Sequence, residues 1–303
     1  MKLATIRLDD TGDAGSAARA LGGLRGLDAL DGLGGRTTAV RVEGDSFVDL
    51  GLPDVGAVLA SPGGLAAAAT ADGPRRSSAG AAFAPLVPRP TKVVCVGLNY
   101  QKHIKEMGRD LPEHPTLFSK FADTLIGARD DVRRPAETEQ FDWEAELAVV
   151  IGRPVRRADE TEAAAAIAGF TVLNDITCRD WQFRTREWLQ GKNWDATTPV
   201  GPYLVTTDEL GGPRPALDIS CTVNGRLMQQ DNTGDLLFDP VDLVRYISTM
   251  IRLNPGDIIA TGTPGGVGHA RKPPVFLVPG DTVITEIAGL GRLENTVIAD
   301  GAR

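Results

Sequence analysis

Residues 142–152 read DWEAELAVVIG, a charged segment that leads into a continuous apolar run. The apolar part, 147–151, has the length of a short buried strand and ends at Gly152. Because alternate residues of a strand point the same way, Glu144 and Glu146 would lie on one face of it. A solvated strand edge carries such a pair without any function, whereas two carboxylates that converge in a pocket need a compensating cation. The stretch therefore predicts a buried strand and makes a metal site a hypothesis to pursue.

Outward from this strand, short apolar runs and turns recur along most of the chain. Further strands are predicted at 3–8, 38–42, 46–49, 93–96, 172–174, 203–206, 218–223, 258–261 and 283–287, and helices at 53–70, 163–170 and 239–253. The pair Asn224-Gly225, between two apolar runs, is the strongest short hairpin signal in the chain. Strands dominate and no internal repeat is visible, so we predict the α+β class.

The composition is that of an ordinary globular protein. Of 303 residues, 42% are hydrophobic and 24% are charged, which excludes wholesale disorder. The formal net charge of −8 argues against a nucleic-acid-binding protein, whose surface would be basic. No apolar run approaches the roughly 18 residues that a membrane-spanning helix needs. With 35 glycines and 20 prolines, the chain is predicted to be rich in turns and strands.

A proline-rich connector divides the chain. Pro85, Pro88 and Pro90 make a stiff segment, and domains of about 100–200 residues are the usual expectation. We therefore predict a boundary near residue 88, with a small N-terminal α+β domain over 1–88 and a larger domain over 89–303.

Cysteine content and the first residues bear on the compartment. Cys95, Cys178 and Cys221 are too few and too scattered for a disulfide framework, and no two of them form a Cys-x-x-Cys pair. The N-terminal residues MKLATIRLDD carry charges where a signal peptide needs an apolar stretch. We expect a reduced, cytoplasmic protein.

A third carboxylate, Asp175, follows the strand predicted at 172–174. Acids in this position often face a pocket, although many only cap the next turn. Three carboxylates with no nearby histidine or cysteine suit a hard cation such as Mg²⁺ or Mn²⁺ better than zinc. If Asp175 converges on Glu144 and Glu146, the three make a divalent-cation site.

His103 and Glu106 are three residues apart, so on a helical turn they would be neighbours. A carboxylate beside a histidine raises its basicity and fixes its tautomer, which makes His103 a candidate general base. A surface ion pair at the same spacing is the alternative interpretation, and spacing alone favours it.

Two further segments carry candidate chemistry. Lys192, in the run GKNWD, is either a partly desolvated cation that stabilises an enolate or an exposed loop lysine. The glycine-rich run 262–268 lacks the GK[ST] end of a P-loop, and no G-x-G-x-x-G run opens a helix there, so we reject nucleotide binding.

Several runs, taken together and in order, resemble the fumarylacetoacetate hydrolase family over about residues 92–298. They are VGLNY at 96–100 followed by His103 and Glu106, PTLFSK at 115–120, the Glu144/Glu146 run through Gly152, NDITCRDWQ at 174–182, and the segments 191–202 and 255–268. Their joint order is highly specific to that family.

This resemblance implies a mixed β-roll with flanking helices, usually a homodimer, with a bound Mg²⁺ or Mn²⁺ ion. The implied metal ligands are Glu144, Glu146 and Asp175. The implied catalytic residues are His103 and Glu106, on a segment that closes over the substrate, and Lys192. The implied substrate-binding residues are Arg179, Gln182 and Thr263.

The resemblance also implies an enzyme that acts on a small 2-oxo acid or 1,3-dicarbonyl compound, with no nucleic-acid or membrane partner. Because the His103–Glu106 pair suits water activation, we rank first the metal-dependent hydrolysis of a C–C bond in an acylpyruvate or fumarylpyruvate. Isomerisation or hydration of a 2-oxo-ene dioate in aromatic catabolism is the first alternative, and oxaloacetate decarboxylation or tautomerisation on the same site is another. A catalytically silent, metal-dependent binding protein is the hypothesis from outside enzymology.

Overall fold

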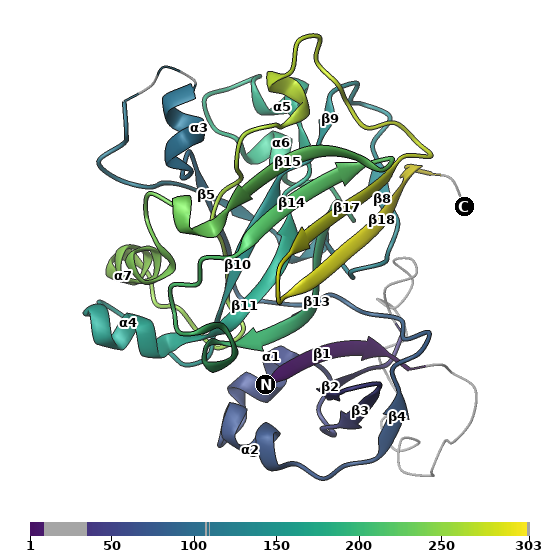
Figure 1. Cartoon of the computed structure of the whole chain (residues 1–303), viewed down its shortest axis with the longest axis vertical. Helices are drawn as coiled ribbons and strands as arrows, with labels where there is room; N and C mark the ends of the chain where they lie inside the picture. Colours follow the sequence, from purple (N-terminus) through teal and green to yellow (C-terminus); the bar gives the residue numbers. More distant parts are fainter. Residues whose placement is uncertain (9–34, 107, 109, 302–303) are drawn as a thin grey trace, which may run out of the picture.

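The computed structural model describes residues 1–8, 35–106, 108 and 110–301 (Figure 1). Its largest sheet contains β1 Lys2–Arg7, β2 Thr37–Glu43, β3 Ser46–Asp49, β4 Arg75–Ser77, β5 Val93–Gly97, β6 Thr116–Lys120, β7 Leu125–Ile126, β10 Ala145–Ile151, β11 Ile167–Asn174, β13 Thr198–Thr206 and β16 Ile258–Ala260. The order is β4-β3-β2-β1-β13-β11-β10-β16-β5-β6, with β7 paired to β13. The strand predicted from 147–151 is thus central, between β11 and β16.

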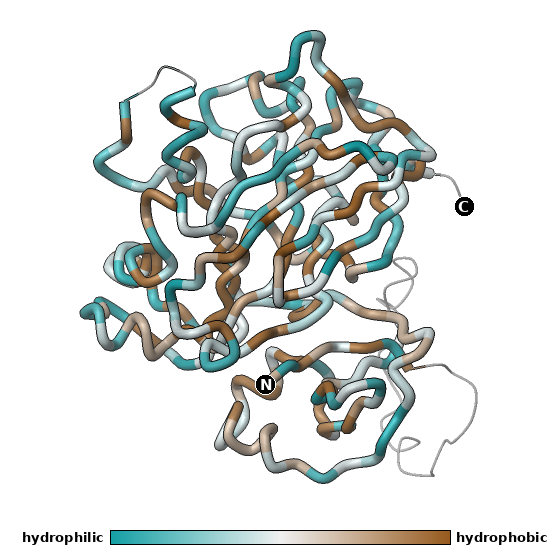
Figure 2. The backbone as a smooth tube through the Cα atoms, in the orientation of Figure 1, coloured by the Kyte–Doolittle hydropathy of each residue, from teal (hydrophilic) through white to brown (hydrophobic). Residues whose placement is uncertain are grey.

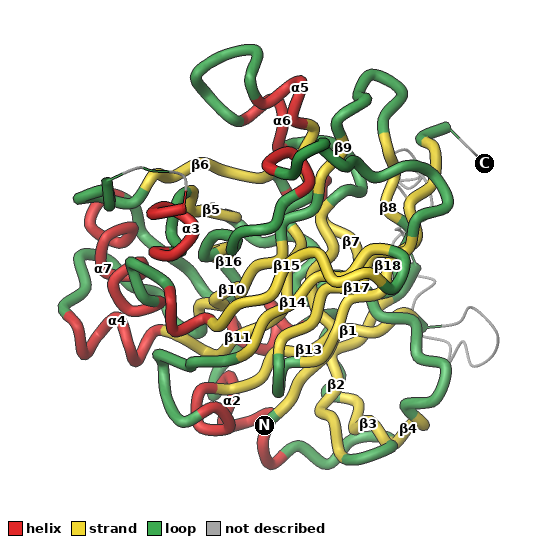
Figure 3. Tube along the Cα trace, turned by 45° about the horizontal axis from the view of Figure 1, so that its top comes forward, coloured by secondary structure: helices red, strands yellow, loops and turns green. Residues whose placement is uncertain are grey.

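A second sheet lies across the central strands of the first (Figure 3). It consists of β8 Val132–Arg134, β14 Asp218–Val223, β15 Arg226–Asn232, β17 Thr282–Ile287 and β18 Gly291–Ala299, in the order β15-β14-β17-β18-β8. Leu147 and Val149 of β10 share one buried cluster with Val283 and Leu293 of the second sheet. Hydrophobic residues accordingly gather along the central strands and hydrophilic ones along the outer loops (Figure 2). This arrangement confirms the predicted α+β roll.

The helices are few and short. They are α1 Val55–Ala60, α2 Gly64–Thr70, α3 Gln101–Glu106, α4 Glu160–Ala166, α5 Arg179–Gln182, α6 Leu189–Lys192 and α7 Pro240–Met250. Asp239 caps α7 by accepting hydrogen bonds from the backbone N–H groups of Val241 and Asp242. In the described part of the chain, every helix is too short or too polar to cross a bilayer.

Two predicted helices were wrong in part. The helix predicted over 163–170 ends at Ala166, because Ile167 begins β11, which pairs with β10 on one side and β13 on the other. The capping box of Asp159 and Glu162 begins the helix, which continues into the alanine-rich segment only as far as Ala166. The helix predicted over 53–70 is two helices, α1 and α2, separated by a turn in which Gly63 has a φ of 80°.

Gly169 of β11 allows two strands to approach closely, and we expect Gly169→Ala to destabilise the fold. A Cβ at this position would lie 2.1 Å from the carbonyl oxygen of Val205 on β13. Overpacking of this kind costs about 1–3 kcal/mol, so the melting temperature should fall by several degrees. Gly35→Ala is the control, because nothing lies within 4 Å of a Cβ there. Equal melting temperatures for the two variants would contradict the argument.

The N-terminal segment continues the large sheet. Strand β1 pairs antiparallel with β13, where Leu3 lies opposite Leu204. Arg7 also forms an ion pair of 2.7 Å with Asp130. These contacts cross the predicted boundary near residue 88, and the division into domains 1–88 and 89–303 remains a proposal.

Candidate active site

Three buried carboxylates gather at the end of the central strands. Glu144 and Glu146 lie where β10 begins, two positions apart. Strand β11 runs antiparallel to β10 with Asn174 opposite Ala145, and the N–H of the next residue, Asp175, donates to the carbonyl of Glu144 at 2.9 Å. One ligand atom from each of the three acids lies within 4.8 Å of the others. Strand alternation thus supplies two acids and antiparallel pairing supplies the third.

Two buried lysines reach into this cluster. Lys192, at the end of α6, lies 2.7 Å from Glu144 Oε2 and 2.8 Å from Asp175 Oδ2. Lys120, at the end of β6, lies 2.7 Å from Asp175 Oδ1 and donates to the carbonyl of Lys192. Burial alone would lower the pKa of Lys192, but the charges of Asp175 and Glu144 raise that pKa to about 12. Lys192 is therefore a cation at neutral pH, which suits it to stabilise a negative oxygen rather than to accept a proton.

The acids differ in how well their charge is compensated. Burial, followed by the charges of Asp175 and Glu144, raises the pKa of Glu146 well above its ordinary value. A hydrogen bond of 2.8 Å from the backbone N–H of Gly262 opposes this only in part. Burial would also raise the pKa of Asp175, but Lys120 and Lys192 hold it below its ordinary value. Additional positive charge beside Glu146 would therefore stabilise the cluster, as a divalent cation would supply.

Arg179, the first residue of α5, is buried among acceptors. Its Nε lies 2.8 Å from Asp142 Oδ2, and its Nη1 lies 2.6 Å from Glu144 Oε1 and 3.0 Å from Gln182 Oε1. Although burial opposes it, the charges of Asp142 and Glu144 raise the pKa of Arg179 above its ordinary value. Its Nη2 has no hydrogen-bond partner within the described residues. A buried N–H without an acceptor is costly, so Nη2 is a ready donor to a ligand oxygen.

The glycine-rich run 262–268 joins this cluster to helix α3. Its first residue bonds to Glu146, as described above. At Gly265, an added Cβ would lie 3.2 Å from both His103 Nδ1 and Glu106 Oε2. A residue with a side chain at this position would crowd that pair, so the glycine permits the close approach of α3 to the loop.

The structure brings His103 and Glu106 together, as the spacing predicts. His103 Nδ1 lies 4.0 Å from Glu106 Oε2, and the two side chains are 15% and 70% exposed. This distance is longer than a hydrogen bond. In unliganded enzymes catalytic hydrogen bonds are often long and shorten when substrate binds, so the catalytic role of the pair stays a prediction.

The structure gathers the predicted residues into one region. Glu144, Asp175, Lys192, Arg179 and Gln182 form a connected network of hydrogen bonds and ion pairs. A carboxylate oxygen of Glu146 lies within 4.8 Å of oxygens of Glu144 and Asp175. The glycine run carries Thr263 and lies against His103 and Glu106.

Three buried residues of this region were missed in the sequence. Lys120 ends the run PTLFSK and Asp142 opens the run DWEAE, and in both cases a charge at the end of an apolar strand was the available signal. Gln229 lies in a hairpin strand and offers no signal, since an isolated glutamine there is ordinary.

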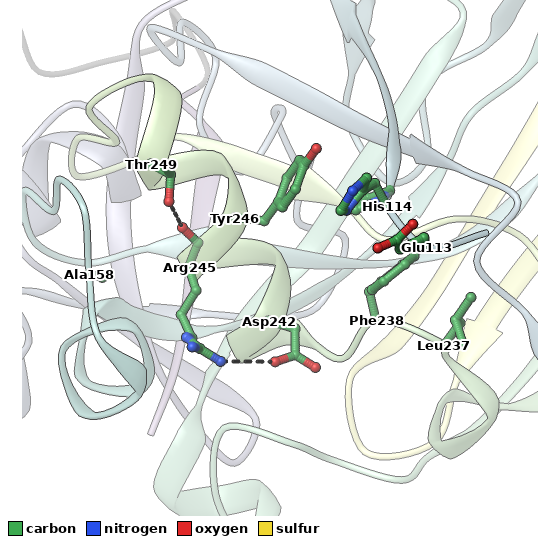
Figure 4. Close-up of a pocket in the computed structure, with 10 residues that line it drawn as sticks. Glu113, His114, Ala158, Leu237, Phe238, Asp242, Arg245, Tyr246 and Thr249 are labelled. Carbon is green, nitrogen blue, oxygen red and sulfur yellow. Dashed lines mark hydrogen bonds and ion pairs between the residues drawn. The ribbon is translucent and has the colours of Figure 1, made fainter. Parts of the chain in front are cut away.

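A separate open pocket of about 560 Å³ lies on the outer side of α7 (Figure 4). His114 stacks on Tyr246 with ring centroids 6.0 Å apart, and Arg245 lies 3.6 Å from Asp242. None of the predicted site residues lines this pocket. The pocket is therefore distinct from the cluster of buried acids and lysines.

Known proteins resemble this chain in sequence and in fold. Residues 92–298 match the model of the fumarylacetoacetate hydrolase C-terminal domain. The chain belongs to the fumarylacetoacetate hydrolase family. It is 48% identical to the human protein named oxaloacetate tautomerase FAHD2A, mitochondrial, over a stretch of 214 residues that covers 70% of this chain and 68% of that protein.

Two solved structures extend the comparison. The fumarylacetoacetate hydrolase from the psychrophile Exiguobacterium antarcticum has a TM-score of 0.80 and 31% identity, covering 99% of each chain. The fumarylpyruvate hydrolase from Pseudomonas aeruginosa, in complex with Mn²⁺ and pyruvate, has a TM-score of 0.63 and 32% identity, covering 69% of this chain and 90% of that one. The present chain is an enzyme of this family with the family's fold, and its buried acids form a candidate metal site.

Proposed function

We propose that this enzyme interconverts the keto and enol forms of oxaloacetate or of a closely related 2-oxo diacid. The identity of 48% with a human protein named as an oxaloacetate tautomerase supports this choice. The structural observation that carries it is the buried Nη2 of Arg179, which has no acceptor among the described residues. The Arg179 side chain also lies beside the Lys192 cation, since Nη1 of Arg179 and Nζ of Lys192 both bind Glu144. A diacid with an oxo group supplies oxygens for these two donors. This proposal places tautomerisation above the C–C hydrolysis that the sequence ranked first.

Glu144, Glu146 and Asp175 fit a Mg²⁺ or Mn²⁺ ion. The donors are all carboxylate oxygens, which these hard cations prefer. Burial, followed by the charges of Asp175 and Glu144, raises the pKa of Glu146, so a cation beside it would favour its ionised form. When bound, such an ion supplies Lewis-acid polarisation of a substrate oxygen.

The side chains of the enzyme then have distinct tasks. Arg179 and Thr263 bind carboxylate oxygens of the diacid, and Gln182 holds Arg179 in place. His103, assisted by Glu106, takes a proton from C3 of the keto form. The C–H electron pair becomes the C2=C3 double bond, and the negative charge that develops on the C2 oxygen is stabilised by Lys192. Protonated His103 then gives its proton to the C2 oxygen, which forms the enol and restores the neutral base, so no C–C bond breaks and no water is consumed.

C–C hydrolysis is the second candidate. The likeness to a fumarylpyruvate hydrolase solved with Mn²⁺ and pyruvate favours it. In that reaction His103 would take its proton from water, and the hydroxide would attack the distal carbonyl. The C–C bond beside that carbonyl would break, giving a carboxylic acid and the enolate of the 2-oxo acid, which takes up the proton from His103. Release of pyruvate or another 2-oxo acid as a product distinguishes this reaction from tautomerisation.

The test measures the conversion of enol-oxaloacetate to the keto form. The loss of the ultraviolet absorbance of the enol monitors this conversion. With Mg²⁺ or Mn²⁺ we expect the purified enzyme to accelerate the conversion without forming pyruvate, and EDTA should abolish the acceleration. Fumarylpyruvate and acetylpyruvate are tested in parallel for pyruvate release. No acceleration with either ion would overturn the proposal, and metal-dependent pyruvate release from an acylpyruvate would establish the hydrolase instead.

Three further properties are proposed on the family resemblance and the sequence: a homodimer, a cytoplasmic location and a place in aromatic catabolism. The name of the human relative places that protein in mitochondria. Sedimentation of the purified enzyme tests the dimer, and cell fractionation tests the location.

A further inference from the structure

A buried glutamine connects the acid-bearing strand to the glycine run. Gln229 lies on β15 with 1% of its surface exposed. Its Oε1 accepts a hydrogen bond of 2.9 Å from the N–H of Ala145, the residue between Glu144 and Glu146. Its Nε2 donates to Thr263 Oγ1 at 2.8 Å and to the carbonyl of Pro264 at 2.9 Å. One amide thus bridges the two parts of the site.

The orientation of this amide follows from the chemistry of its neighbours. The N–H of Ala145 can only donate, so it requires the oxygen of Gln229. The carbonyl of Pro264 can only accept, so it requires the nitrogen. A flipped amide would oppose donor to donor and acceptor to acceptor in a buried place, and both groups would lose their partners.

The orientation of the Gln229 amide restricts how the hydroxyl of Thr263 can hydrogen-bond. This hydroxyl can either accept a hydrogen bond from Gln229 or donate one to it, and the fixed amide allows only the first. Its own proton must therefore point away from Gln229, toward another acceptor. Thr263 is half-buried, and its neighbour Gly265 lies against His103 and Glu106.

We infer that Gln229 is a positioning residue, which sets Thr263 as a hydrogen-bond donor to a substrate carboxylate. The inference rests on the proposed function in assigning Thr263 to the substrate. It adds a basis for substrate recognition to that function. An ionised carboxylate can only accept hydrogen bonds, and the Thr263 hydroxyl, which already accepts one from Gln229, is left to donate. Gln229 thereby contributes to selection of an anionic substrate without touching it.

The test is a double-mutant cycle on oxaloacetate tautomerisation, with Gln229→Met, Thr263→Ala and the double variant. Gln229→Met keeps the size of the side chain and removes both polar ends. A hydrogen bond to a charged group predicts an increase in KM of about tenfold to a hundredfold for each single variant, with kcat within about threefold of wild type. In the double variant the KM should equal that of Thr263→Ala alone, since Gln229 acts through Thr263. Thr263→Ser, which keeps the hydroxyl, should restore a KM near that of wild type.

Gln229→Leu is the second variant, in case Gln229→Met does not fold. The leucine is also uncharged and offers no N–H to Thr263, so its effect on KM should also vanish in the Thr263→Ala background. An unchanged KM in either folded Gln229 variant would overturn the inference, as would increases that multiply in the double variant.

A separate measurement distinguishes this outcome from failure of the proposed function. If wild type does not tautomerise oxaloacetate, the same cycle is read from the affinity for oxalate, measured calorimetrically in the presence of Mn²⁺. If Gln229→Met weakens oxalate binding when Thr263 is present but not in the Thr263→Ala variant, the positioning role is supported even then. If Gln229→Met lowers the oxalate affinity equally in both cases, its role is merely structural.

Discussion

Replacing His103 with alanine should slow oxaloacetate tautomerisation by about 10²–10⁴-fold, the usual contribution of a general acid–base group. Lys192, with a pKa of about 12, is held as a cation by Asp175 and Glu144 and does not accept a proton at neutral pH. Glu144 and Asp175 are engaged by Lys120, Lys192 and Arg179, and Glu146 accepts a hydrogen bond from the backbone N–H of Gly262 and is a proposed metal ligand. His103 is thus the residue best suited to take the proton from C3.

The affinity for Mn²⁺, measured by calorimetry, should be the same in His103→Ala and wild type, because His103 is not one of the three proposed metal ligands. His114→Ala is the matched control, since His114 stacks on Tyr246 in the outer pocket and should leave turnover unchanged. Turnover of His103→Ala at the wild-type rate would exclude His103 as the base.

Glu146→Gln and Asp175→Asn should both abolish tight Mn²⁺ binding, but only Asp175→Asn should lower the stability of the metal-free enzyme. Loss of a residue that only hydrogen-bonds to a metal ligand lowers metal affinity by about 10–100-fold. Loss of a ligand itself should lower it at least as much. The two acids differ because their surroundings differ.

Asp175 is the partner of two buried cations, Lys120 at 2.7 Å and Lys192 at 2.8 Å. Removing its charge leaves both lysines short of compensation, and breaking a buried pair in this way costs on the order of 3 kcal/mol. Glu146, in contrast, is crowded by the charges of Asp175 and Glu144. An amide at that position relieves the repulsion and still accepts a hydrogen bond from Gly262, so the free energy of unfolding should stay the same or rise.

Urea unfolding with EDTA measures the stability, and calorimetric titration measures the affinity for Mn²⁺. Asp130→Asn is a control for the loss of a partly buried acid outside the site, since Asp130 pairs with Arg7 at 2.7 Å; it should leave Mn²⁺ binding intact. Equal destabilisation by Glu146→Gln and Asp175→Asn would contradict the charge distribution described above, and unchanged Mn²⁺ affinity in both would exclude these acids as ligands.

The segment 163–170 illustrates the limit of local patterns. Alanines favour a helix, and the capping box at Asp159 starts one. The helix ends where Ile167 begins β11, which pairs with β10 and, from Gly169 on, with β13. The close approach that Gly169 allows exists only once β13 is in place. Local propensity is a weak preference, and burial between two strands overrides it.

Features that depend on near neighbours in the chain can be predicted from the sequence alone. Alternation along one strand places Glu144 and Glu146 on the same face, and helical spacing makes His103 and Glu106 neighbours. The order of motifs identified the family over 92–298, which the family model matches.

Only the tertiary structure decided the partners of these residues. Lys120 lies 55 positions from Asp175 in the chain, and Gln229 lies 34 positions from Thr263. Such pairs form because strands distant in sequence meet at one end of the sheet. The same burial that brings them together removes water from their charges, and it thereby sets which acid is compensated, which lysine stays charged and which hydroxyl is left to donate.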